Sequence, residues 1–114
     1  MTKELEGFTL FKPPLKNEIH ISIRKRCIGI SIDACEALGS KWINVFFDER
    51  KKRMMVKRAE EGYKNTLKIS DNGESGRTIN SAGVCETLKR MFGDRAKIGG
   101  HVAGDGIIIF DEVR

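Results

Sequence analysis

The spacing of hydrophobic residues predicts two short strands and a short helix near the start of the chain. Isoleucines alternate with other residues on both sides of Arg24, which is the period of half-buried strands: they are Ile19, Ile21, Ile23, Ile28, Ile30 and Ile32. Ser31 is a favourable N-cap for a helix whose apolar positions stand three to four residues apart and end at Leu38. Gly39 is a favourable residue to terminate that helix.

Beyond the helix, the hydrophobic period returns to two and predicts a β-hairpin. Residues 43–47 form its first strand, the polar residues 48–52 form its turn, and residues 54–56 form its return strand. Phe46 and Phe47 are adjacent, so they face opposite sides of the first strand. Burial on both sides of a sheet explains such a pair more simply than an aromatic surface for single-stranded nucleic acid.

Residues 66–113 repeat this order of elements. Two extended pieces precede a helix that is capped by Asn80 or Ser81 and ended by Gly93. A second hairpin follows, with its turn at residues 104–106, where glycine and aspartate suit a tight reversal.

The two halves align at Cys35-Glu36-Ala37-Leu38 and Cys85-Glu86-Thr87-Leu88, with an offset of about fifty residues. This agreement and the shared order of elements predict an internal duplication. The length of 114 residues suits a single domain. We expect that domain, residues 1–114, to consist of an N-terminal arm or edge strand, a first unit, a linker and a second unit, at residues 1–18, 19–58, 59–65 and 66–113. The predicted fold class is mostly β (α+β), with about seven to nine short strands and two helices.

Two further features are expected outside these elements. Phe8, Leu10 and Phe11 can form an edge strand in the arm, which Pro13-Pro14 must end because proline has no backbone donor. Asn72-Gly73 suits a tight turn in the second unit because both residues tolerate positive φ.

The order of strand, extended piece, short helix and hairpin resembles the AbrB-like swapped-hairpin domain family. The motif of that family is G-[R/K]-x-[apolar]-x-Pro, followed by a short helix that ends in Leu-Gly and by a β-hairpin. Gly76-Arg77-Thr78-Ile79 matches its opening, and Leu38-Gly39 matches its helix end. Ser31 and Ser81 stand where the family has proline, and the first half lacks the Gly-Arg pair. The resemblance implies a barrel of two interlocked units that binds DNA, as antitoxins and transition-state regulators do, with the barrel closed within one chain or between two.

The net charge of +5 lies entirely in the first half of the chain. Through Glu60 there are thirteen Lys or Arg against eight Asp or Glu, whereas from Glu61 onward both number eight. Much of the charge lies in a nine-residue stretch without acids, residues 50–58, and in a second cluster at residues 24–26. Together with Arg77, which the resemblance adds, these clusters define a predicted nucleic-acid-binding set: Arg24, Lys25, Arg26, Arg50, Lys51, Lys52, Arg53, Lys57, Arg58 and Arg77.

The same charges also suit roles that involve no nucleic acid. A charged turn keeps a hairpin tip soluble and blocks strand-to-strand aggregation, and an acidic protein partner would also bind such a surface. If the resemblance carries function, Arg77 contacts phosphates and guanine edges. The alternative for Arg77 is a surface salt bridge with Glu74 or Asp71.

The sequence gives little support for catalysis. His20 and His101 have no cysteine or carboxylate at a metal-binding spacing, and the glycine-rich stretches near residues 99 and 104 precede no helix that could bind phosphate. We therefore expect no catalytic residue, metal or cofactor. The predicted function is a non-catalytic DNA-binding regulator or antitoxin. The alternatives are a phage- or mobile-element-encoded module that binds or inhibits a host protein, and a small-ligand binder at the junction of the two units.

The cysteines predict a reducing, cytoplasmic setting. Cys27, Cys35 and Cys85 are odd in number and lie in apolar segments, where free cysteine acts as a small hydrophobic residue. No signal sequence follows Met1, and no apolar run approaches the length that spans a bilayer. We expect a monomer or homodimer without a membrane segment.

Overall fold

The structure is a computed structural model that describes Gly7, Thr9 and residues 19–62, 64–71 and 76–114. These residues form two helices and eight strands, with the segments that connect them. The elements of the first half are β1 (His20–Ile23), β2 (Ile28–Ile30), α1 (Ile32–Leu38), β3 (Trp42–Asp48) and β4 (Arg53–Arg58). Those of the second half are β5 (Leu67–Asp71), β6 (Arg77–Ile79), α2 (Ala82–Phe92), β7 (Lys97–Gly104) and β8 (Ile107–Val113). Neither of these helices has the length and apolar character needed to span a membrane.

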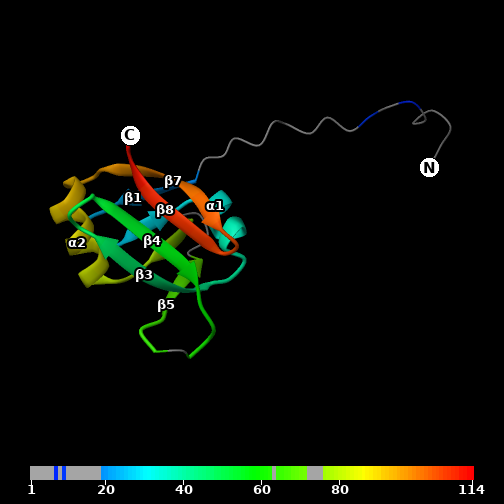
Figure 1. Cartoon of the computed structure of the whole chain (residues 1–114), viewed down its shortest axis with the longest axis horizontal. Helices are drawn as coiled ribbons and strands as arrows, with labels where there is room; N and C mark the ends of the chain where they lie inside the picture. The colour runs from blue at the N-terminus through cyan, green and yellow to red at the C-terminus, as the bar shows by residue number, and fades with distance from the viewer. Residues whose placement is uncertain (1–6, 8, 10–18, 63, 72–75) are drawn as a thin grey trace.

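The eight strands close into one antiparallel barrel in the order β1-β2-β6-β5-β3-β4-β8-β7 (Figure 1). The counterparts in the two halves are β1 and β5, β2 and β6, β3 and β7, and β4 and β8. When each strand is exchanged for its counterpart, the strand order of the ring is unchanged, so the topology has a pseudo-twofold axis. The β3–β4 hairpin lies between β5 and β8, and the β7–β8 hairpin lies between β1 and β4. Each hairpin is therefore inserted between strands of the other half. The predicted mostly-β barrel is confirmed, and it closes within a single chain.

Apolar side chains from every strand fill the barrel. The alternation of isoleucines in the sequence places one face of each strand inside, and the inward residues include Ile21, Ile28, Ile43, Met54, Ile69, Ile79, Ile98 and Ile108. Gly100 permits a close approach of β8, because a Cβ there would lie 2.6 Å from Cδ1 of the buried Phe110. The ladder between β7 and β8 is irregular at the same place, between Gly99 and Gly100.

Each helix has a serine as its N-cap residue. Ser31 Oγ accepts hydrogen bonds from the N–H groups of Ala34, at 3.3 Å, and His20, at 3.1 Å. Ser81 Oγ accepts one from the N–H of Val84, at 3.3 Å. The Ser31 N–H also donates to the His20 carbonyl at 3.0 Å, a hydrogen bond that the proline of the family motif could not make. The helices lie at opposite ends of the barrel (Figure 1).

Several boundaries differ from the predicted ones. β4 continues to Arg58 because its last residues pair on both sides; Lys57, for example, lies opposite Asn44 in β3 and Ile107 in β8. The second hairpin has a shorter turn than predicted, since only Asp105 and Gly106 separate β7 from β8. The expected edge strand at Phe8, Leu10 and Phe11 and the expected turn at Asn72-Gly73 lie outside the described residues.

Candidate nucleic-acid interface

The tip of the β3–β4 hairpin presents three exposed basic side chains, Arg50, Lys51 and Lys52. Asp48 shapes this tip, because its carboxylate accepts hydrogen bonds from the Lys51 N–H at 3.2 Å and from Arg53 Nε at 3.0 Å. The hydrogen bond from Lys51, followed by that from Arg53, lowers the pKa of Asp48. Arg53 is thereby paired within the hairpin, while the three tip residues project beyond it.

The turn between β1 and β2 carries the second basic cluster, Arg24, Lys25 and Arg26. All three residues are exposed, and the turn closes with a hydrogen bond of 3.0 Å from the Arg24 N–H to the Cys27 carbonyl. The Arg24 side chain lies across β2, because a Cβ at Gly29 would be only 2.6 Å from its Nη2. Glycine at this position therefore leaves room for the guanidinium.

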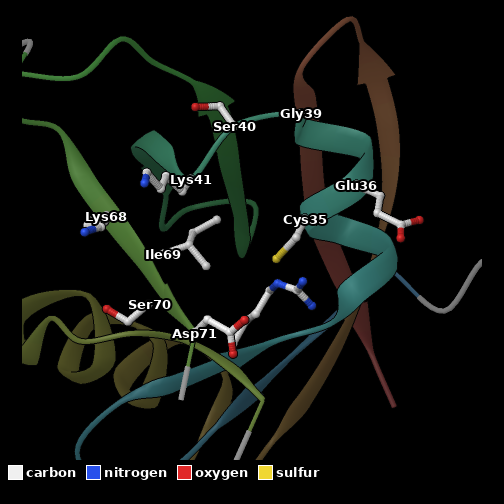
Figure 2. Close-up of a pocket in the computed structure, with 10 residues that line it drawn as sticks. Cys35, Glu36, Gly39, Ser40, Lys41, Lys68, Ile69, Ser70 and Asp71 are labelled. Atoms are coloured by element: carbon white, nitrogen blue, oxygen red, sulfur yellow. The ribbon is translucent and has the colours of Figure 1, made fainter. Parts of the chain in front are cut away.

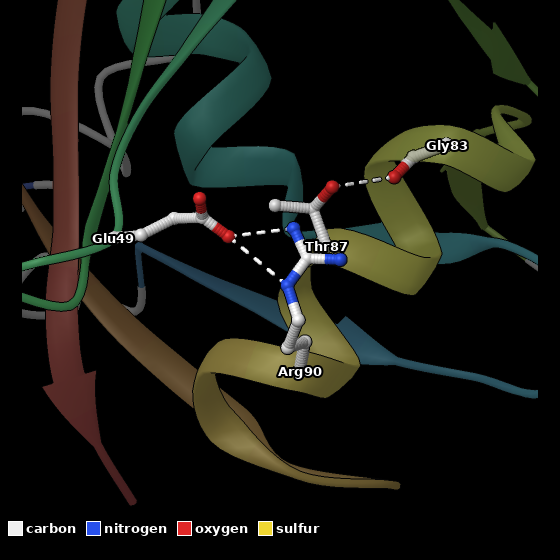
Figure 3. A network of polar contacts seen from close by, with 4 residues as sticks. All are labelled: Glu49, Gly83, Thr87 and Arg90. Atoms are coloured by element: carbon white, nitrogen blue, oxygen red, sulfur yellow. Dashed lines mark hydrogen bonds and ion pairs between the residues drawn. The ribbon is translucent and has the colours of Figure 1, made fainter.

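The last turns of α2 contact both basic segments. Lys89 Nζ donates to the Lys25 carbonyl at 2.7 Å. At the next position of the same helix, Arg90 donates from Nε and Nη2 to Glu49 Oε1 at 3.1 and 2.6 Å (Figure 3). The two clusters, about 25 residues apart in the sequence, are thus held at one end of the barrel with α2 between them.

A shallow hollow of about 230 Å³ lies where α2 meets the β1–β2 turn. Arg24, Lys25, Lys89 and Arg95 line it together with one acidic residue, Asp94. The excess of cations makes this hollow suitable for a phosphate group. We call the surface that includes it the basic end, and define it as Arg24, Lys25, Arg26, Arg50, Lys51, Lys52, Lys89, Arg90 and Arg95.

Three of the sequence-predicted residues lie elsewhere. Lys57 and Arg58 are at the far end of β4, roughly 17 Å along the strand from the hairpin tip. Arg58 pairs with Asp105 at 3.0 Å and approaches the carbonyl of Leu38, at the end of α1, at 3.4 Å. Arg77 lines a pocket beside α1. The structure therefore brings together residues 24–26 and 50–52, and separates them from Lys57, Arg58 and Arg77.

Sequence reasoning missed Lys89, Arg90 and Arg95. A signal for the first two existed, because basic residues in the last turn of a helix complement its dipole and often face solvent. Their proximity to the two clusters depends on the packing of α2 against the β1–β2 turn. There the buried thiol of Cys85 donates to the carbonyls of Arg24 and Cys27, at 3.4 and 3.7 Å.

Two further predictions concern metal ligands and the adjacent phenylalanines, Phe46 and Phe47. Within the described ranges, no group of three or more His, Cys, Asp or Glu could hold a metal ion. His101 Nδ1 lies 3.8 Å from Asp111 Oδ1 on the outside of the barrel. Phe47 packs against the core, whereas Phe46 is 48% exposed, so only one member of the adjacent pair faces inward.

Comparison of the chain with protein-family models, with curated proteins and with solved structures found no match. The resemblance to the AbrB-like swapped-hairpin family stays a prediction.

Proposed function

We propose that this protein is a non-catalytic DNA-binding protein, of the regulator or antitoxin kind, and that it contacts duplex DNA through the basic end. The observation that carries the proposal is the contact of α2 with both basic segments, through Lys89 to Lys25 and through Arg90 to Glu49. These contacts bring the basic residues of the β1–β2 turn, the β3–β4 hairpin tip and α2, which lie far apart in the sequence, to the same end of the barrel. A surface of this kind can neutralise several phosphates at once and release their counterions.

The geometry of the basic end supports contact with the DNA backbone. Its cations come from a hairpin tip, a tight turn and the end of a helix, so their side chains can follow a curved row of phosphates. Arg50, Lys51 and Lys52 are exposed, which leaves their charges available to a ligand. Glu49 and Asp94 reduce the positive charge locally but do not balance it.

Duplex binding at two salt concentrations tests the proposal. We expect fluorescence anisotropy to show binding of a random-sequence duplex at about 50 mM salt, with a loss of affinity on the order of 500-fold at about 200 mM if about five phosphates are neutralised. Absence of binding at the lower concentration, or a loss below about tenfold, would contradict the proposal.

An acidic protein partner is the second candidate, and a partly exposed apolar row beside the hairpin tip favours it. Phe46, Met55 and Ile109 are neighbours across β3, β4 and β8, and Phe46 is two residues from Asp48 at the start of the tip. A protein with acidic groups that bound the tip would also cover this row. Val113, which is 60% exposed at the end of β8, provides a control position. If duplex binding is absent, this candidate is favoured when an acidic protein copurifies with the unsubstituted chain and with Val113→Ser, but not with Phe46→Ser.

A further inference from the structure

A hollow lies at the opposite end of the barrel from α2, between α1 and the strands β5 and β6. Its volume is about 660 Å³, within the range of pockets that bind small molecules. The lining includes Cys35 and Lys41 from the first half, and Lys68, Ile69 and Arg77 from the second. The pocket is therefore formed at the junction of the two halves.

The helix that borders this pocket, α1, is shorter than its counterpart in the second half, α2. α1 has 7 residues and α2 has 11, although each begins at a serine cap four residues before a cysteine. Cys85 of α2 is buried against the β1–β2 turn, whereas Cys35 of α1 is only partly buried. The chain leaves α1 at Gly39, and the residues just after it border the pocket instead of a further turn of helix.

The charges around the pocket favour an anion. Arg77, Lys41 and Lys68 line it, and Asp71 lies opposite Arg77 in the β5–β6 ladder. Figure 2 shows the carboxylate of the other acidic lining residue, Glu36, pointing to the outer side of α1. Among the described lining residues, Arg77 and Lys41 therefore bring two positive charges to the pocket against the carboxylate of Asp71, while the Lys68 ammonium lies 5.7 Å from the centroid of the Trp42 ring.

The floor of the pocket is less polar than its rim. The Cys35 sulfur points toward the Ile69 side chain, which is almost fully buried (Figure 2). Burial raises the pKa of the Cys35 thiol, although the positive charge of Arg77 acts in the opposite direction. The thiol is therefore neutral near pH 7 and adds to an apolar floor beside the cations.

We propose that this pocket binds a small organic anion, whose carboxylate or phosphate group is held by Arg77 and Lys41 and whose apolar body rests on Ile69 and Cys35. A guanidinium can hold either group through two parallel hydrogen bonds. The site is separate from the basic end and does not depend on DNA binding, so either proposal can fail without the other.

Three ring compounds of similar shape and different charge test this proposal. In ¹H–¹⁵N NMR titrations of the whole chain, benzoate is expected to shift the amide signals of Gly39, Ser40 and Ile69 in a saturable way at millimolar concentration, while benzamide and benzamidine are not. Phenyl phosphate against benzoate then distinguishes the two anionic groups, and inorganic phosphate tests the need for the apolar body.

Two arginine variants locate the binding. Arg77→Gln is expected to weaken benzoate binding at least about tenfold, because a charge-assisted hydrogen bond is lost, whereas Arg95→Gln at the basic end leaves it unchanged. If Arg77→Gln does not fold, Lys41→Gln at an exposed position is expected to weaken binding several-fold. Equal shifts with benzamide, shifts confined to the basic end, or no shifts with either organic anion up to about 10 mM would overturn the proposal.

Discussion

Asp48 is the residue that most directly shapes the proposed DNA-contacting tip. Its carboxylate accepts hydrogen bonds from Lys51 and Arg53, and these bonds lower its pKa from the ordinary value of 3.8. A carboxyl group with a lowered pKa in the folded state stabilises the fold above its unfolded pKa, and this contribution is lost as the pH falls through the folded value.

We therefore expect Asp48→Asn to lower the free energy of unfolding near pH 6, and the difference from the unsubstituted protein to shrink as the pH falls below 3.8. Urea unfolding of both proteins over this pH range measures the difference. A difference that stays constant down to the lowest pH would show that ionisation of Asp48 does not stabilise the fold.

Glu49 offers a second test at the residue scale. It holds Arg90 in an ion pair in which both side chains are more than half exposed, so Glu49→Gln should change the free energy of unfolding by less than about 1 kcal/mol. The substitution removes a negative charge from the basic end, while the glutamine carbonyl can still accept hydrogen bonds from Arg90, so duplex affinity should rise several-fold. Unchanged affinity, measured by anisotropy at low salt, would place Glu49 outside the proposed DNA-contacting surface, and a fall in affinity would give it a direct role in binding.

At the scale of elements, the two helix caps provide a matched pair. Ser31 Oγ accepts hydrogen bonds from Ala34 and His20, and so joins α1 to β1, whereas Ser81 Oγ accepts one from Val84. Ser31→Ala should therefore cost about 2 kcal/mol of stability and Ser81→Ala about 1 kcal/mol. Equal costs in urea unfolding would indicate that the hydrogen bond from His20 adds nothing.

Local elements could be predicted from the sequence because their causes are local. Ser31 and Gly39 mark the ends of α1. The alternation of isoleucines marks strand faces that the structure confirms as buried through Ile30, but it is wrong for Ile32, which begins α1 and is 55% exposed. The separation of Arg58 from the hairpin tip could not be predicted, because it depends on how far β4 pairs with β8. Likewise, the pocket beside Arg77 depends on contacts between the halves, which no local pattern encodes.

At the scale of the whole molecule, the barrel depends on pairing between its two halves. Four ladders join them: β1 with β7, β2 with β6, β3 with β5, and β4 with β8. Either half alone would leave strand edges and an apolar face open to solvent, and such edges promote association.

We therefore expect fragments 1–62 and 63–114 to be unfolded or aggregated when produced separately, and to form a folded one-to-one complex when produced together. Size-exclusion chromatography and circular dichroism measure both outcomes. A separate fragment that folds as a stable monomer would contradict the interlocked arrangement.

The proposal that the protein binds DNA through the basic end is tested most directly with two triple variants that remove the same charge. One replaces Arg50, Lys51 and Lys52 at the hairpin tip with serine, and the other replaces Lys41, Lys57 and Lys64, which are also exposed but lie outside the basic end. At about 50 mM salt, we predict that the tip variant binds duplex at least a hundredfold more weakly, with a salt slope reduced by about 2.7, while the other variant changes less than about threefold. Equal weakening by both variants, or no weakening by the tip variant in a folded protein, would contradict DNA binding through the basic end.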